Sequence, residues 1–179
     1  MEITPQNVNS IARSLGQTLI KAGYKMIVSA FNIQPKLVFY NEIVNLISTK
    51  LNCESSLLDS NYYLIDFVTW KDIIACDWLV DTKKWIADKF DCDNWSYAFA
   101  SHISELFDIS VACMYGEIFN KDTKKSLGYH YWNTILTKEL DGLHLYFYEP
   151  ENNQYVEIIG QSQIIIGNWI YKQIKIIVF

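Results

Sequence analysis

Arginine is nearly absent from this chain of 179 residues: Arg13 is the only one, and the formal net charge is -5. No run of lysines alternates with aromatic residues, so the sequence does not indicate a nucleic-acid partner. No apolar run reaches about 18 residues, so we expect no membrane-spanning helix. The start of the chain lacks the basic region and short apolar core of a secretory signal. We therefore expect a cytoplasmic protein, in the host cytoplasm if its source is viral.

The four cysteines contain no Cys-x-x-Cys pair, which argues against a structural zinc site. Their wide spacing is also unlike that of a small disulfide scaffold, so we expect reduced thiols. Apolar residues make up 50% of the chain and charged residues 20%, which is typical of a globular protein. No linker is visible, so residues 1–179 are predicted to form one domain with a sizeable core.

The predicted elements place helices first and strands afterwards, with a polar loop at residues 52–61. Residues 62–68 fit a short strand or a helical turn, and periodicity does not decide between them. Helices are expected at 5–31, 37–51, 69–79, 82–89 and 92–107, and strands at 109–119, 129–136, 143–149, 154–159 and 163–179. This order predicts an α+β fold, with an antiparallel C-terminal sheet packed on the helix that carries Cys92. The domain divides into a helical N-terminal extension (1–65), a core (66–160) and a final strand (161–179).

Cys92 lies in the first turn of the predicted helix 92–107, directly after Asp91, a favoured N-cap residue. The positive end of the helix dipole and the unpaired N–H groups favour the thiolate, the reactive form of cysteine. The same N–H groups are placed to hold an oxyanion. The alternative is that Cys92 is a small buried residue at a helix start, because free cysteine is among the most buried residue types.

A nucleophilic thiol needs a base and a group that orients the base. His130 and Glu149 lie on the two strands of a predicted hairpin. Pairing of Leu136 with Leu143 would place His130 opposite Glu149, whereas a tight Asp-Gly turn would place Glu149 opposite Thr134. Both registers put His130 and Glu149 on the same face of the sheet. The alternative for Glu149 is an exposed acid at a strand end.

The other two histidines are interpreted as structural. His102 lies roughly 15 Å along the helix from Cys92, at 1.5 Å of rise per residue. His144 points to the face opposite Glu149, together with Tyr146 and Tyr148.

Three short motifs carry a family resemblance: Asp-Cys-Asp-Asn-Trp-Ser at 91–96, Gly-Tyr-His-Tyr-Trp-Asn at 128–133 and Tyr-Phe-Tyr-Glu-Pro-Glu-Asn at 146–152. They resemble the motifs of papain-like and transglutaminase-like cysteine enzymes. More closely, they resemble those of the cysteine-peptidase module of the fairy-ring-mushroom agglutinin and related small phage and bacterial proteins. The resemblance covers about residues 70–155 and implies a papain-like fold. It also implies Cys92 as nucleophile, His130 as base and Glu149 as orienting acid.

The resemblance further implies calcium, since the mushroom module depends on it. Asp88, Asp91 and Asp93 are close enough in sequence to offer oxygen ligands to a hard cation. The alternative is that these three residues are acids at a helix N-terminus. No other cofactor is expected.

The aromatic residues Trp95, Tyr131 and Trp132 would give a substrate cleft apolar walls, although they are also ordinary core candidates. Tyr131 stands where the family has a small or aliphatic residue, which would narrow the site. The oxyanion-hole side chain is not identifiable: Trp78, Trp85 or a glutamine would serve.

The leading hypothesis is a cysteine hydrolase of the peptidase or amidase type. Its thiolate would attack a peptide or amide carbonyl and form a thioester, which water would resolve. A transglutaminase- or deamidase-type acyltransferase would use the same groups. A peptidoglycan amidase fits less well, because His144 lies on the other face. The rival from another class is a non-catalytic structural or partner-binding protein, viral sources included. Its Ile-rich residues 163–179 would suit a homo-oligomer interface, the alternative being a final core strand.

Overall fold

The structure is a computed structural model that divides into two compact units, Met1–Ile33 and Gln34–Phe179. It describes residues 14–16, 18–19, 22–23, 26, 29–31, 33–51, 53–76, 83–159 and 163–178. The described residues from 14 to 30 are helical, in agreement with the predicted helix 5–31 where that helix is described. Nothing more follows for the first unit, and the single domain of residues 1–179 stays a prediction.

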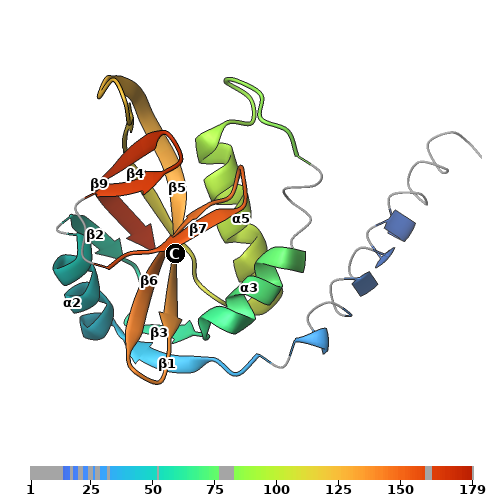
Figure 1. Cartoon of the computed structure of the whole chain (residues 1–179). Coiled ribbons are helices and arrows are strands. Elements are labelled where there is room, and N and C mark those ends of the chain that lie inside the picture. Colours follow the sequence, from blue (N-terminus) through green and yellow to red (C-terminus); the bar gives the residue numbers. More distant parts are fainter. Residues whose placement is uncertain are drawn as a thin grey trace, which may run out of the picture. The chain divides into compact units, whose positions relative to one another are not determined.

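A seven-stranded mixed sheet dominates the second unit (Figure 1). Its strands run in the order β2-β9-β4-β5-β6-β7, and β8 also pairs with β9. The bounds are Glu54–Leu57 (β2), Ala112–Asn120 (β4), Ser126–Lys138 (β5), Leu143–Glu149 (β6), Gln154–Glu157 (β7), Gln163–Ile166 (β8) and Trp169–Val178 (β9). Strand β2 is parallel to β9, and the other pairs are antiparallel.

Shorter elements complete the unit. Strands β1 (Lys36–Phe39) and β3 (Asn61–Leu64) pair in a two-stranded antiparallel sheet. The described helices are α2 (Tyr40–Leu51), α3 (Phe67–Cys76) and α5 (Cys92–Phe107). Helix α5 therefore begins at Cys92, as the sequence predicts.

The predicted fold class, an α+β papain-like fold with N-terminal helices and an antiparallel C-terminal sheet, is wrong. The predicted helix 37–51 is present from Tyr40 to Leu51, but β1 lies at its expected start and β2 lies in the expected polar loop, where β2 joins the main sheet in parallel with the last strand. Their partners lie far along the chain, so local periodicity gives no sign of this pairing. The predicted helix 82–89 is absent from its described residues, where a turn closes between Ile86 and Phe90 instead.

The C-terminal segment 163–179 is not one strand but the antiparallel hairpin β8–β9. Gly167, with φ of 56°, lies in the turn and adopts the left-handed conformation that glycine tolerates best. Strand β9 pairs with β4 on one side and with β2 and β8 on the other. Much of its backbone pairing is therefore satisfied within the chain, and a homo-oligomer through this segment stays a prediction.

Helices α2 and α5 cover opposite faces of the sheet (Figure 1). Phe147 of β6 joins a buried cluster with Ile43 and Ile47 of α2. Its neighbour Tyr148 packs against Phe99 of α5, with ring centroids 4.5 Å apart. Because successive residues of a strand point to opposite faces, the sheet is buried on both sides.

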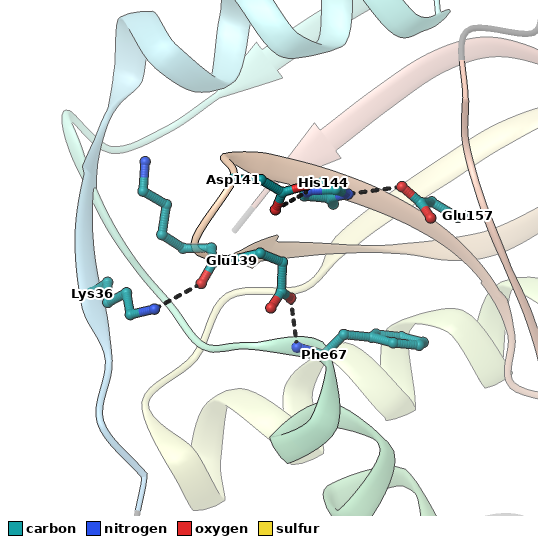
Figure 2. Close-up of polar contacts among 7 residues, drawn as sticks. Lys36, Phe67, Glu139, Asp141, His144 and Glu157 are labelled. Atoms are coloured by element: carbon teal, nitrogen blue, oxygen red, sulfur yellow. Dashed lines mark hydrogen bonds and ion pairs between the residues drawn. The ribbon is translucent and has the colours of Figure 1, made fainter.

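Hydrogen bonds tie the first elements of this unit to the β5–β6 hairpin (Figure 2). Lys36 Nζ donates to the Lys138 carbonyl oxygen at 3.0 Å, and the Phe67 N–H donates to Glu139 Oε1 at 2.8 Å. Both acceptors lie at the tip of the hairpin. The tip is therefore held from β1 on one side and from the start of α3 on the other.

Candidate functional site

The first turn of α5 is shaped by its own acidic and amide side chains. Asp91 is the N-cap residue, and its backbone N–H donates to Asn94 Oδ1 at 3.4 Å. Asp91 Oδ2 accepts the Asp88 N–H at 3.2 Å, so the preceding turn is tied to the same residue. These contacts fix Cys92 at the first helical position, where N–H groups have no partner within the helix.

The β5–β6 hairpin brings His130 and Glu149 together. Leu136 pairs with Leu145, so both registers expected from the sequence are wrong. The observed register lies midway between the two expected ones and differs from each by two residues. A register shift of two residues leaves every side chain on the same face of the sheet. As predicted, His130 and Glu149 share a face, and His130 Nε2 lies 2.7 Å from Glu149 Oε2.

Cys92 is the third polar group of the site, because its side chain interacts with His130 closely enough to help raise the pKa of that histidine. Since Nε2 of the imidazole faces Glu149, Nδ1 is the ring nitrogen left for the thiol. Burial of the ring lowers the pKa of His130, but the interactions with Cys92 and Glu149 outweigh it and raise the pKa to about 9. The structure thus brings Cys92, His130 and Glu149 together.

This chain of groups is largely shielded from water. His130 is 6% exposed and Glu149 is 1% exposed. The buried Glu149 carboxylate also affects two neighbouring side chains. The pKa values of Glu151 and Tyr171 are raised first by burial and then by the negative charge of Glu149. Charges buried in a medium of low dielectric interact strongly, so His130 and Glu149 form a tightly coupled pair.

Aromatic rings surround the His130 imidazole. The ring centroids of Trp132 and Tyr171 each lie 6.0 Å from it, and that of Trp169 lies 6.3 Å away. Trp132 and Tyr171 are fully buried, whereas Trp169 is 37% exposed. The sequence interpretation missed Trp169 and Tyr171. The sequence does contain a pattern that could have identified them: Trp169 and Tyr171 are two residues apart in the Ile-rich segment, so they lie on one face of a strand.

The three predicted cleft residues fall in different places. Trp95 is 2% exposed and Trp132 is fully buried, so neither can offer a ring face to a ligand. Tyr131 is half-buried and lies against Tyr97 and Tyr115, with ring centroids 5.7 Å and 4.7 Å away. The sequence interpretation did not include Tyr97 and Tyr115 in the site.

The other cysteines lie in different surroundings. Cys113 is buried, its Sγ lies 3.8 Å from the Ser96 carbonyl oxygen, and burial raises its pKa to about 11. Burial also raises the pKa of Cys53, whereas Cys76 is exposed. The described contacts link only Cys92 of these four to a histidine.

The remaining histidine and tryptophan candidates lie elsewhere. His144 is held between Asp141 Oδ1 at 3.1 Å and Glu157 Oε1 at 2.7 Å (Figure 2). Trp85 is 51% exposed. Trp78 lies outside the described residues.

The described residues contain no group of three or more His, Cys, Asp or Glu side chains placed to hold a metal ion. The side chains of Asp91 and Asp93 interact with each other, which lowers the pKa of Asp91 and raises that of Asp93. Calcium binding at Asp88, Asp91 and Asp93 is still only a prediction.

Comparison with known proteins gives likenesses in structure alone. No family model matches the chain, and no curated protein matches it. The structure of PSL1a in complex with E-64 matches with a TM-score of 0.52 and 19% identity, covering 79% of this chain and 51% of that one. Polyporus squamosus lectin bound to the influenza-binding epitope Neu5Acα2-6Galβ1-4GlcNAc also matches with 0.52 and 19%, covering 79% and 49%. This chain shares a fold with about half of that lectin.

These findings overturn the predicted family and activity. The similar structures belong to a lectin, and no family model or curated protein supports a papain-like or transglutaminase-like cysteine peptidase. The expected hydrolase, the acyltransferase and the non-catalytic viral or structural protein are likewise without support, as is a peptide or amide substrate. Among the described residues, no helix is both long and apolar enough to cross a membrane.

Proposed function

We propose that Cys92, His130 and Glu149 form a nucleophilic thiol site that bonds covalently to a ligand with an electrophilic carbon. One observation carries this proposal: His130 Nε2 lies 2.7 Å from Glu149 Oε2, and the same imidazole interacts with the Cys92 side chain, which helps to raise its pKa. A thiol, a base and a group that orients the base are the parts that activate a cysteine. Cys92 is the nucleophile, His130 holds the proton, and Glu149 orients the imidazole and stabilises its cationic form.

The charges of the three groups support this assignment. A pKa of about 9 keeps His130 protonated at neutral pH when its partners carry negative charge. The imidazolium and the positive end of α5 both stabilise a thiolate at the first helical position. When Cys92 gives up its proton to react, its thiolate is paired with the His130 imidazolium, which the buried Glu149 carboxylate stabilises.

An epoxide illustrates the covalent step. The Cys92 sulfur attacks one ring carbon, a C–S bond forms, and the C–O bond to that carbon breaks with its electron pair moving to oxygen. The His130 imidazolium then gives its proton to the alkoxide. Cys92 ends as a thioether, His130 ends neutral, and the ligand ends as an alcohol, with no oxidant or reductant required.

The test is site-selective labelling of the full chain at pH 7 with E-64, which carries an epoxide, and with iodoacetamide. Peptide mass mapping should find a single early adduct on Cys92. The exposed Cys76 and the buried Cys113 serve as internal controls. Cys92→Ser should abolish the early adduct. Labelling of Cys92 no faster than Cys76 would exclude the proposal.

Carbohydrate binding is a second candidate, supported by the likeness to a lectin whose structure holds Neu5Acα2-6Galβ1-4GlcNAc. The match covers only 49% of the lectin chain, so the lectin's glycan binding has to be tested on this chain directly. Immobilised Neu5Acα2-6Galβ1-4GlcNAc, with the α2-3-linked isomer as control, provides the assay. Retention on the first surface at micromolar protein supports a lectin function, and equal, negligible retention on both excludes this glycan as the ligand.

A further inference from the structure

Four tyrosine rings form a continuous row beside the thiol site, here called the tyrosine row: Tyr129, Tyr115, Tyr131 and Tyr97. The ring centroids of Tyr129 and Tyr115 are 5.2 Å apart and nearly parallel, at 16°. Tyr115 lies 4.7 Å from Tyr131, which lies 5.7 Å from Tyr97. The row therefore crosses from β4 and β5 to α5.

Strand pairing and sequence spacing explain why the rings meet. Tyr115 of β4 lies directly opposite Tyr131 of β5, and Tyr129 is two residues earlier on β5. Side chains two residues apart on a strand share a face. Tyr97 then reaches this face from the second turn of α5.

The tyrosine row is open to solvent. Tyr129 is 62% exposed and Tyr97 is 38% exposed, while Tyr115 and Tyr131 are half-buried. Beyond Tyr97 lies a hollow of about 400 Å³ on α5, which Ala100, Ser101, Ser104 and Glu105 also line. Contiguous exposed aromatic surface of this kind is typical of ligand-binding sites rather than of ordinary protein surface.

Tyr129 and Tyr131 flank His130 on β5, so the row runs next to the thiol site. Burial, then the neighbouring tyrosines, then the charge of Cys92 raise the pKa of Tyr115. For Tyr131 the order is burial, Tyr97, Asp93 and then Cys92. Two members of the row thus lie within electrostatic range of the thiol, and the negative charges nearby include Asp93 as well.

We propose that the tyrosine row recognises the ligand that bonds to Cys92, by stacking against an aromatic arm that carries no negative charge. This inference rests on the proposed thiol site. Tyrosine faces attract other rings and cations, and stacked pairs contribute about 0.5–1.5 kcal/mol beyond the area that they bury. Asp93 near the row and Glu105 in the hollow repel an anionic arm, so the preferred arm is neutral or cationic.

The experiment compares the alkylation rates of Cys92 by iodoacetamide and by N-benzyl-iodoacetamide, which share the reacting carbon. In the natural chain the benzyl compound should react faster, and its 4-carboxybenzyl analogue should lose the advantage. Tyr129→Ala should lower the benzyl-to-unsubstituted rate ratio by roughly three- to tenfold, the effect of one stacking contact. Tyr129→Leu, which keeps an apolar side chain, should lie between.

Tyr155→Ala is the matched control. Tyr155 is 43% exposed and contacts Phe67, outside the tyrosine row. Its loss should leave the rate ratio unchanged. If Cys92 is labelled selectively but Tyr129→Ala and Tyr155→Ala give the same ratio as the natural chain, the tyrosine row is not the recognition surface and the thiol site stands. If Cys92 of the natural chain is not labelled selectively, both proposals fail.

Discussion

Glu149 is the residue that sets the charge of the site. It is 1% exposed and lies 2.7 Å from His130 Nε2. A buried carboxylate next to an imidazole favours the imidazolium, and the imidazolium in turn favours a thiolate at Cys92. The reactivity of the half-buried Cys92 therefore depends on a side chain that no ligand reaches.

Glu149→Gln should reduce the labelling of Cys92. The amide keeps the shape and can still hydrogen-bond His130, but it removes the negative charge, so the pKa of His130 should fall below its value of about 9. A shift of about one unit or more is usual for the loss of an opposite charge at this distance. An NMR titration of the His130 ring measures the shift, and iodoacetamide labelling at pH 7 should slow roughly tenfold. An unchanged titration would show that Glu149 does not control the imidazole.

Trp169 is the solvent-facing member of the aromatic rings around His130. Trp169→Ala should admit water and weaken the attraction between His130 and its two charged partners. The pKa of His130 should therefore fall. The pH range in which the epoxide E-64 labels Cys92 rapidly should narrow at its basic end, because that step needs the proton of the imidazolium. Ile165→Ala, on the same hairpin and 45% exposed, removes apolar surface without a described contact to His130 and should leave the range unchanged. If the labelling rate of Cys92 depends on pH in the same way in both variants, Trp169 does not have this role.

At the scale of elements, the packing of β4 against β9 leaves no room for a side chain at Gly116. A Cβ at this position would lie 1.9 Å from the Lys172 carbonyl oxygen and 2.7 Å from Cη2 of Trp132. The β4–β9 register also shifts between Tyr115 and Gly116. Neither obstacle can move easily, because one is backbone and the other is a fully buried ring. This glycine allows the strand carrying Trp169 and Tyr171 to reach the site.

Gly116→Ala should lower the free energy of unfolding by about 3 kcal/mol, as expected when a packed interior must accept an extra carbon. Denaturant unfolding measures the change. Gly16→Ala is the control, because a Cβ there meets no atom within 4 Å. A Gly116→Ala variant as stable as the natural chain would show that β4 and β9 can separate without cost.

A second contact between elements joins the β5–β6 turn to β7: His144 lies between Asp141 of the turn and Glu157 of β7 (Figure 2). The hydrogen bond to Glu157 outweighs partial burial, and with Asp141 it raises the pKa of His144. Lys36, Lys138, Glu139 and Glu42, which lies 3.7 Å from Lys138 Nζ, are also charged groups at this hairpin tip. Because His144 and His130 are both more basic in the folded chain, the folded state binds more protons than the unfolded state around neutral pH.

For the whole molecule, stability should therefore fall as the pH rises above neutrality. A histidine whose pKa is raised on folding stabilises the fold fully below its unfolded pKa of about 6.5 and loses that contribution as the pH passes the folded value. For His130 the folded value is about 9. The free energy of unfolding should decrease between these limits, by up to roughly 3 kcal/mol for His130.

Denaturant unfolding at a series of pH values measures this decrease. His130→Asn should flatten most of the slope, and Glu157→Gln should remove the smaller part that comes from His144. If stability stays constant between pH 6.5 and 9, the histidines are not more basic in the folded chain than in the unfolded chain, contrary to the pKa values assigned to His130 and His144.

Several local features follow from the sequence alone. The Asp91 cap, the apolar spacing after it and the alternation in β5 and β6 predict the start of α5, the hairpin and the common face of His130 and Glu149, and all three are present. These features depend on neighbours within a few residues, or on side-chain parity, which a register shift of two does not change. Residue types and spacing were sufficient for them.

Tertiary structure alone decided the rest. The parallel pairing of β2 with β9 joins residues more than a hundred positions apart, and the β8–β9 hairpin places Trp169 and Tyr171 against His130. The hairpin register depended on a four-residue loop, closed by Glu139 N–H donating to the Gly142 carbonyl oxygen. Short apolar segments carry little information on their partners, because pairing depends on the packing of the whole sheet. The local sequence pattern could therefore predict neither the fold class nor the aromatic residues around the thiol site.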